Sequence, residues 1–91
     1  MDPHQAIMDM KVHLATLYDD VKLRGSGRAE FVNVYKGLRA ANISLESDNK
    51  SWFVELWTAA NSPPGEETCV DERVIERREE AIDLICSWLV G

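Results

Sequence analysis

The stretch SWFVELWTAA at residues 51–60 constrains the fold most, because it sets five bulky apolar side chains within six consecutive positions. On a helical wheel at about 100° per residue, Phe53 and Leu56 share the centre of one face. Trp52 and Trp57 then fall on opposite edges of that face. We therefore expect a helix that buries most of this stretch in a core. A tryptophan at a core edge offers area and one N–H donor, which suits it to contact a partner.

Helical spacing recurs in three further segments. Asp2 and Pro3 are a favourable N-cap and first residue for a helix, and apolar residues follow at steps of three and four: Ile7, Met10, Leu14, Leu17 and Val21. The segments are separated by Gly25 and Gly27, by Asn42 and by the SPPG turn at 62–65. The spacing and these breaks predict helices at residues 3–23, 27–41, 48–61 and 71–90. Gly37 lies inside the second helix, where it costs about 1 kcal/mol relative to alanine. No alternating apolar and polar run is long enough to predict a strand.

Four helices with short connections predict an all-α fold, a small antiparallel helical bundle of about four helices. The length of 91 residues predicts one domain, spanning residues 1–91. An apolar fraction of 45% and a charged fraction of 29% are typical of a soluble globular chain. A longer first helix followed by a hairpin and a closing helix fits the same periodicity, so the order of the helices in space stays open.

The chain has the features of a cytoplasmic protein. No apolar run approaches the roughly 18 residues of a membrane span, and the first residues lack the charged and apolar regions of a secretory signal. We expect a complete small protein. Cys69 and Cys86 would lie about 25 Å apart if a helix filled most of the interval between them, which is too far for a disulfide. Two free thiols fit a reducing compartment.

No catalytic or metal-binding pattern stands out in the sequence. His4 and His13 lie about 13 Å apart along a helix, so they cannot share a metal ion. The cysteines lack the spacing of a zinc site. Neighbouring carboxylates such as Glu79 and Glu80 point to different sides of a helix, which makes them poor acid–base pairs. We therefore expect no enzymatic activity, no metal and no cofactor.

Charge and off-face apolar residues point instead to a binding surface. The net charge of −6 is concentrated in residues 46–91, which hold four Lys and Arg and eleven Asp and Glu. This acidic half suits a basic partner and opposes nucleic-acid binding, which depends on neutralising phosphates. Met8 and Val12 lie beside the main stripe of the first helix and form a second ribbon. The predicted contacts are Met8, Val12, Trp52, Trp88, Glu76, Glu79 and Glu80.

These observations favour a small protein-binding module, such as an adaptor, an inhibitor or a regulatory subunit, without catalytic activity of its own. Its partner would be another protein of basic character, with a homodimer as a further option. Two alternatives stay open. One is a nucleic-acid-linked regulator that uses the basic residues between positions 22 and 39, namely Lys22, Arg24, Arg28, Lys36 and Arg39. The other is a small-ligand binder with a pocket inside the bundle.

Overall fold

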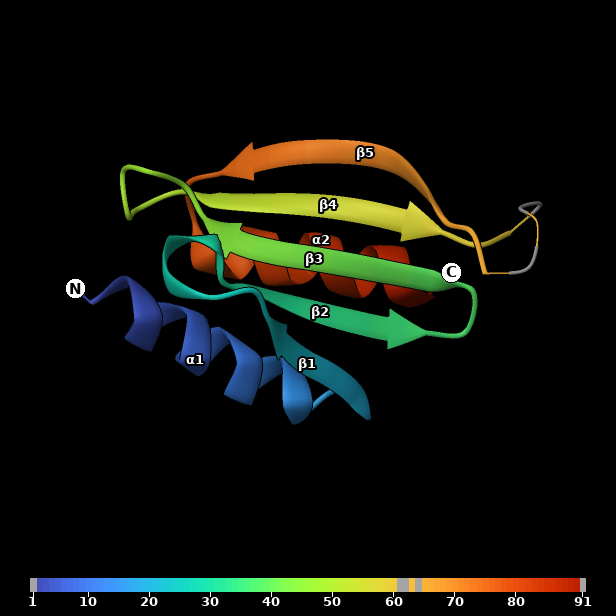
Figure 1. Ribbon diagram of the computed structural model, residues 1–91, viewed down its shortest axis with the longest axis horizontal. Helices are drawn as coiled ribbons and strands as arrows, with labels where there is room; N and C mark the ends of the chain where they lie inside the picture. Colours follow the sequence, from blue (N-terminus) through green and yellow to red (C-terminus); the bar gives the residue numbers. More distant parts are fainter. Residues whose placement is uncertain (1, 61–62, 64, 91) are drawn as a thin grey trace.

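The middle of the chain folds into a sheet, so the predicted all-α bundle is wrong. The computed structural model describes residues 2–60, 63 and 65–90 and shows an α+β fold (Figure 1). Helices α1 (Pro3–Ala15) and α2 (Arg78–Val90) flank one antiparallel sheet with the strand order β1-β2-β3-β4-β5. The strands are β1 (Asp20–Arg24), β2 (Phe31–Lys36), β3 (Arg39–Leu45), β4 (Trp52–Thr58) and β5 (Thr68–Ile75), and a short 3-10 turn, η1 (Gly27–Ala29), precedes β2.

The strand register sorts the side chains onto two faces, because alternate residues of a strand point to opposite sides. Val34 of β2 pairs with Ala41 of β3, which pairs with Leu56 of β4. Val32, Ile43 and Val54 form the next row on the same face, and these six residues are all at most 5% exposed: Val32, Val34, Ala41, Ile43, Val54 and Leu56. This face of the sheet is therefore one wall of the hydrophobic core.

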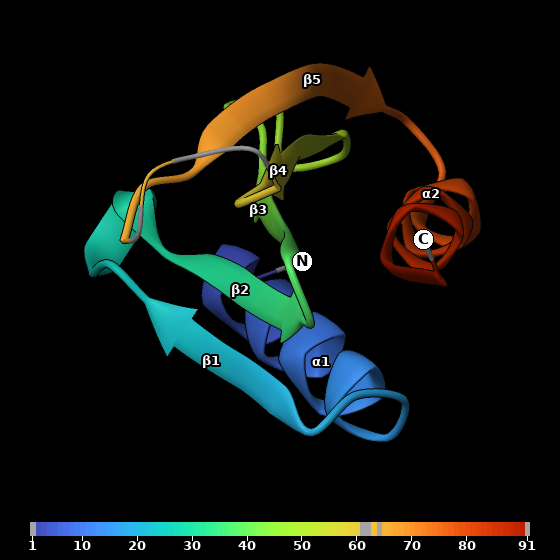
Figure 2. The same ribbon diagram turned by 90° about the vertical axis from the view of Figure 1, so that its right-hand side faces the viewer.

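Both helices pack on that apolar face. The core joins Ile7, Met10 and Leu14 of α1 and Ile82 and Ile85 of α2 to the buried strand residues. Helix α1 covers β1 to β3, while α2 covers β3 to β5. Figure 2 shows the sheet curving from β5, next to α2, round to β1, next to α1. The opposite face carries no helix among the described residues, and we call it the open face.

The sequence predicted the two ends of the chain better than its middle. Asp2 caps α1, its carboxylate accepting a hydrogen bond from the N–H of His4, and Pro3 is the first helical residue. The predicted stripe is buried as far as Leu14, but the helix ends at Ala15 and β1 follows. Of the helix predicted at 71–90, residues 78–90 form α2, whereas residues 71–75 belong to β5. No helix among the described residues is long and apolar enough to cross a membrane.

The helices predicted at 27–41 and 48–61 are strands. In β2 the apolar residues Val32 and Val34 alternate with Asn33, which is the two-residue period of a strand and not a helical stripe. Gly37 lies in the turn between β2 and β3 with a φ of +62°, a backbone conformation that glycine adopts without strain. The turn predicted at 62–65 lies partly outside the described residues.

Asp48 organises the turn between β3 and β4. Its Oδ1 atom accepts hydrogen bonds from the N–H groups of Lys50 and Ser51, each at 2.8 Å, and its Oδ2 atom accepts one from the Ser51 hydroxyl at 2.8 Å. These bonds favour the ionised carboxylate. The backbone N–H of Ser51, followed by that of Lys50, therefore holds the pKa of the Asp48 carboxyl below its ordinary value.

This turn predicts a pH dependence of stability. A carboxyl whose pKa is lower in the folded chain stabilises the fold above its unfolded pKa, about 3.9 for Asp. The stabilisation by Asp48 is therefore lost as the pH falls from about 3.9 through the lower pKa that Asp48 has in the folded chain. We expect Asp48→Asn to be less stable than the wild type at pH 7 and about as stable near pH 2. Urea titrations followed by circular dichroism test this, and an equal difference at both pH values would contradict it.

Candidate functional site

A row of polar residues crosses the open face from one edge of the sheet to the other. The strand register places one residue of each strand in line, and we call these residues the polar row: Lys22, Asn33, Asn42, Glu55 and Glu72. Four of the five strands thus contribute a polar residue between two apolar neighbours that face the core. The row has a cation at the β1 edge, two amides in the middle and two carboxylates toward the β5 edge.

The two amides form a hydrogen-bonded pair at the centre of the polar row. Asn33 Nδ2 donates to Asn42 Oδ1 at 2.6 Å. Asn33 is only 5% exposed, and its buried Oδ1 atom has no hydrogen-bond partner among the described residues. An unpaired buried polar atom of this kind costs about 1–3 kcal/mol. The pair at the centre of the polar row is therefore buried, and one of its acceptors lacks a partner within the described part of the chain.

Aromatic residues flank the polar row on both sides. Phe31 and Phe53 lie two residues before the polar-row residue of β2 and of β4, and Tyr35 and Trp57 lie two residues after it, on the same face. All four are half-buried, so each presents part of its ring to solvent. The Tyr35 hydroxyl donates to Glu67 Oε1 at 3.0 Å, which ties the segment before β5 to this end of the face. Burial, followed by this bond, raises the pKa of Tyr35.

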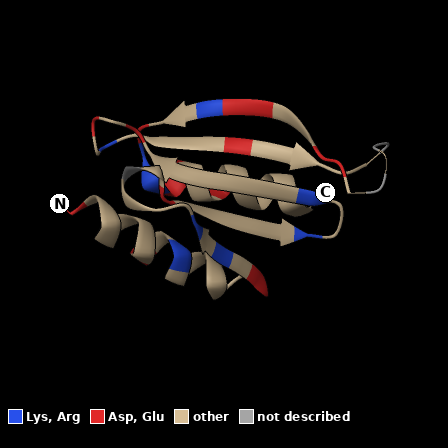
Figure 3. Ribbon diagram, viewed as in Figure 1, with Lys and Arg blue, Asp and Glu red and all other residues tan. Residues whose placement is uncertain are grey.

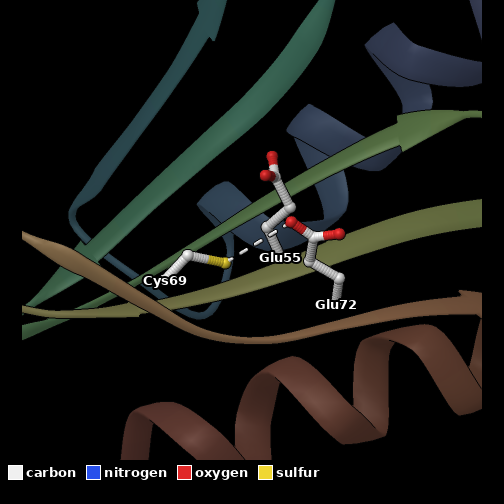
Figure 4. A group of neighbouring side chains, drawn as sticks. All are labelled: Glu55, Cys69 and Glu72. Atoms are coloured by element: carbon white, nitrogen blue, oxygen red, sulfur yellow. Dashed lines mark hydrogen bonds between the residues drawn. The ribbon is translucent and has the colours of Figure 1, made fainter.

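The β5 side of the polar row ends in a cluster of Glu55, Cys69 and Glu72. Potential ligand atoms of the three side chains all lie within 4.8 Å of one another (Figure 4). The Cys69 thiol lies 3.5 Å from the carbonyl of Asp71 and 4.0 Å from Glu72 Oε1. Burial is the main cause that raises the pKa of this thiol. The hydrogen bond to the Asp71 carbonyl opposes it, and the charges of Glu55, Glu72 and Asp71 add to the rise.

The raised pKa of the Cys69 thiol disfavours its thiolate form, so this thiol is not an activated nucleophile. Glu55 and Glu72 are direct cross-strand neighbours of like charge, a pairing that destabilises a sheet. Neither carboxylate has an ion-pair partner among the described residues. The cluster is therefore best matched by a cation supplied from outside the chain.

Opposite charges lie at opposite edges of the open face. Figure 3 shows acidic segments side by side on β4 and β5, and basic segments on β1. On β1, Lys22 and Arg24 are exposed, and Lys22 makes only a long contact of 3.8 Å with Asp20 of its own strand. Four strand spacings of about 4.8 Å separate Lys22 from Glu72, or roughly 19 Å, so the two cannot pair within one chain.

The structure separates the residues predicted from the sequence as partner contacts. Trp52 is 5% exposed and belongs to the core. Met8 is half-buried on α1, whereas Val12 is 61% exposed there. Glu76, Glu79 and Glu80 are exposed before and within the first turn of α2. Of the seven, Trp52 and Glu76 are brought together, because both line a hollow of about 790 Å³ between α1, the β3–β4 turn and the start of α2.

Trp88, also predicted as a partner contact, is committed to the fold. Its indole N–H donates to the carbonyl oxygens of Ala40 at 3.0 Å and Trp57 at 3.2 Å. The guanidinium of Arg39 lies 4.1 Å from the centre of the indole ring and donates to the Trp88 carbonyl oxygen at 2.8 Å. Trp88 therefore joins the end of α2 to β3 and β4, and its N–H is not free for a partner.

The basic residues proposed for nucleic-acid binding do not form one patch. Arg39 stacks on Trp88, and Lys36 lies 6.0 Å from the ring centre of Tyr18, so both are engaged away from Lys22 and Arg24. The side chain of Arg28 lies outside the described part of the chain. Exposed aromatic rings on a sheet can stack bases, but Glu55 and Glu72 would repel the phosphates beside them. A pocket inside a helical bundle is excluded with the bundle itself.

A sequence signal for the polar row was present but missed. Lys22, Asn33, Asn42 and Glu55 each lie between two apolar residues, in the triplets VKL, VNV, ANI and VEL. Such a triplet reads as strand with one polar residue on the outer face. Glu72 lacks this signal, because Asp71 and Arg73 flank it.

No protein-family model, no curated protein and no solved structure matches this chain.

Proposed function

We propose that this chain is a protein-binding module whose partner docks on the open face of the sheet. The polar row supports this most directly: the neighbouring carboxylates of Glu55 and Glu72 form no ion pair with any described residue, and half-buried aromatic rings lie on both sides. Aromatic residues are enriched in the buried part of protein interfaces.

The chemistry of the face defines what the partner supplies. A cationic side chain opposite Glu55 and Glu72 would relieve their mutual repulsion and would steer the encounter. Apolar groups opposite Phe31 and Phe53 would remove their exposed edges from water, at about 25 cal/mol for each Å² buried. These requirements describe a protein surface better than a small molecule, because they extend over the whole width of the sheet.

Charge reversal at the centre of the face tests the proposal. The chain is immobilised and exposed to extract of its native source, and the retained proteins are identified by mass spectrometry. We expect Glu55→Lys to lose the retained partner while keeping the fold, since lysine there removes the repulsion with Glu72. The matched control is Val12→Ser on α1, an exposed position away from the sheet, which is expected to retain the partner.

The pair of variants separates this face from the helix surface predicted from the sequence. Loss of the partner in Val12→Ser with retention in Glu55→Lys would place the contact on the ribbon of Met8 and Val12. Equal retention by the wild type and both variants would exclude both surfaces. Circular dichroism of each variant establishes that the fold is kept before the retained proteins are compared.

A further inference from the structure

We propose that the occupant of the open face is a second copy of this chain, packed sheet against sheet about a two-fold axis that runs parallel to the strands. The inference rests on the proposed function, because it names the partner for the same face. It goes further by fixing which residues of the two copies meet.

A two-fold axis over β3 and parallel to the strands determines these contacts. Such a rotation reverses the strand order and keeps each residue at its height along the strands, so β1 faces β5 and β2 faces β4 of the second copy. The polar row then faces the polar row. The residues brought opposite one another are Lys22 with Glu72, Asn33 with Glu55, Asn42 with Asn42, and Phe31 with Phe53.

The charges of the polar row are complementary to their own copy in this arrangement. Lys22 of each copy reaches the carboxylate cluster of the other, where Glu72 and Glu55 have no cation among the described residues. A symmetric dimer forms this contact twice.

The same charges reject the other way of stacking two sheets. A two-fold axis perpendicular to the strands would preserve the strand order, so that Lys22 would face Lys22 and Glu72 would face Glu72. Like charges opposed across an interface disfavour it. The polar row therefore selects one of the two symmetric arrangements, and the selected one also matches the aligned packing of sheets in β-sandwiches.

The size and curvature of the face set the strength of this contact. Five strands about 4.8 Å apart and about six residues long cover a projected area on the order of 500 Å². A standard protein interface buries about 800 Å² on each partner, so this face is smaller. Because the sheet curves away toward β1 and β5 (Figure 2), the middle strands β2 to β4 come closest to the second copy. Phe31 and Phe53 then pack together beside the polar row, and the long side chains of Lys22 and Glu72 span the rim. We expect a dimer with a Kd on the order of micromolar.

A second copy fits this face better than an unrelated basic protein. A basic partner would neutralise Glu55 and Glu72, but it would leave Lys22 and Arg24 at the other edge facing like charge. A copy of the chain supplies both signs in the required order. The net charge of −6 per chain opposes association over long range, and salt at about 0.15 M screens it beyond about 8 Å.

Charge exchange between two variants provides a decisive test. Sedimentation is measured on the full chain for the wild type, for Lys22→Glu and for Glu72→Lys, from about 1 µM upward. We expect the wild type to dimerise and each variant alone to be monomeric, its Kd raised at least about tenfold by repulsion at two symmetric contacts. Mixing the two variants should restore a dimer, because each then offers the charge that the other lacks.

The double variant Lys22→Glu with Glu72→Lys should dimerise as the wild type does. Because the two positions lie roughly 19 Å apart within one chain, this rescue cannot arise inside a monomer. The control variants Lys50→Glu and Glu79→Lys make the same charge changes at exposed positions off the face, and they should leave the wild-type Kd unchanged. Single variants that dimerise normally, or a mixture that stays monomeric, would overturn the inference.

The outcomes distinguish this inference from the proposed function. A wild-type chain that stays monomeric while an extract protein is retained by the wild type and lost in Glu55→Lys overturns the second copy and keeps the open face as a binding surface. A monomeric chain whose retained proteins do not depend on Glu55 overturns both.

Discussion

Trp88→Ala is expected to lower the free energy of unfolding by about 3–4 kcal/mol, as truncation of a packed tryptophan does. That is a large share of the roughly 5–15 kcal/mol of a small domain. The loss combines three effects. The carbonyl oxygens of Ala40 and Trp57 lose the indole donor, the Arg39 guanidinium loses the ring that it covers, and a space opens between α2 and the sheet.

Trp88→Phe separates the ring from its N–H group. Phenylalanine keeps an aromatic surface under Arg39 but cannot donate to Ala40 or Trp57, so we expect a smaller loss of about 1–2 kcal/mol. Urea unfolding followed by far-ultraviolet circular dichroism measures all three proteins without depending on tryptophan emission. A Trp88→Ala chain as stable as the wild type but defective in binding would restore the role predicted for Trp88 from the sequence.

The sequence predicted α1 and α2 correctly in type, because their ends carry local signals. Asp2 and Pro3 begin α1, and Ile7, Met10 and Leu14 keep the helical period that buries them. In α2 the residues Ile82, Ile85 and Leu89 do the same. These signals need no knowledge of distant parts of the chain.

The middle of the chain was misassigned because short apolar runs satisfy both periods. In β4, Trp52, Val54 and Leu56 face the core while Phe53 and Trp57 lie on the open face, so both faces are apolar and the alternation is hidden. A helical wheel accepts the same residues. Five strands then pair in an order that only tertiary contacts decide. Period and composition alone therefore cannot separate a two-faced strand from a buried helix.

The candidate site depends on strand register, which is why it could not be predicted directly from the sequence. Glu55 and Glu72 are 17 positions apart in the chain and become neighbours only when β4 pairs with β5. Cys69 joins them because the register shifts between Leu56 and Trp57, which leaves Val70 without a partner on β4. The acidic character of the second half was visible from composition, whereas its focus on one face of the sheet was not.

Gly25→Ala is expected to be the most disruptive glycine-to-alanine change among the glycines that the structure describes. Gly25 follows β1 with a φ of +76°, and a Cβ atom there would lie 2.2 Å from the carbonyl oxygen of Ala29. That oxygen belongs to the backbone, so the whole turn must move to avoid it. Gly37→Ala is the matched control, because Gly37 has a similar φ of +62° but nothing within 4 Å of its Cβ position.

The two alanine variants separate backbone strain from collision. Alanine in the left-handed region costs about 1–2 kcal/mol, which is the loss expected for Gly37→Ala. For Gly25→Ala we expect at least about twice that loss, since the collision adds to the strain. Because β1 is an edge strand that packs mainly against β2 and α1, the damage should begin there. Hydrogen exchange should therefore show the amides of β1 opening before those of β3 and β4, and equal losses in the two variants would show that the turn around Gly25 relaxes freely.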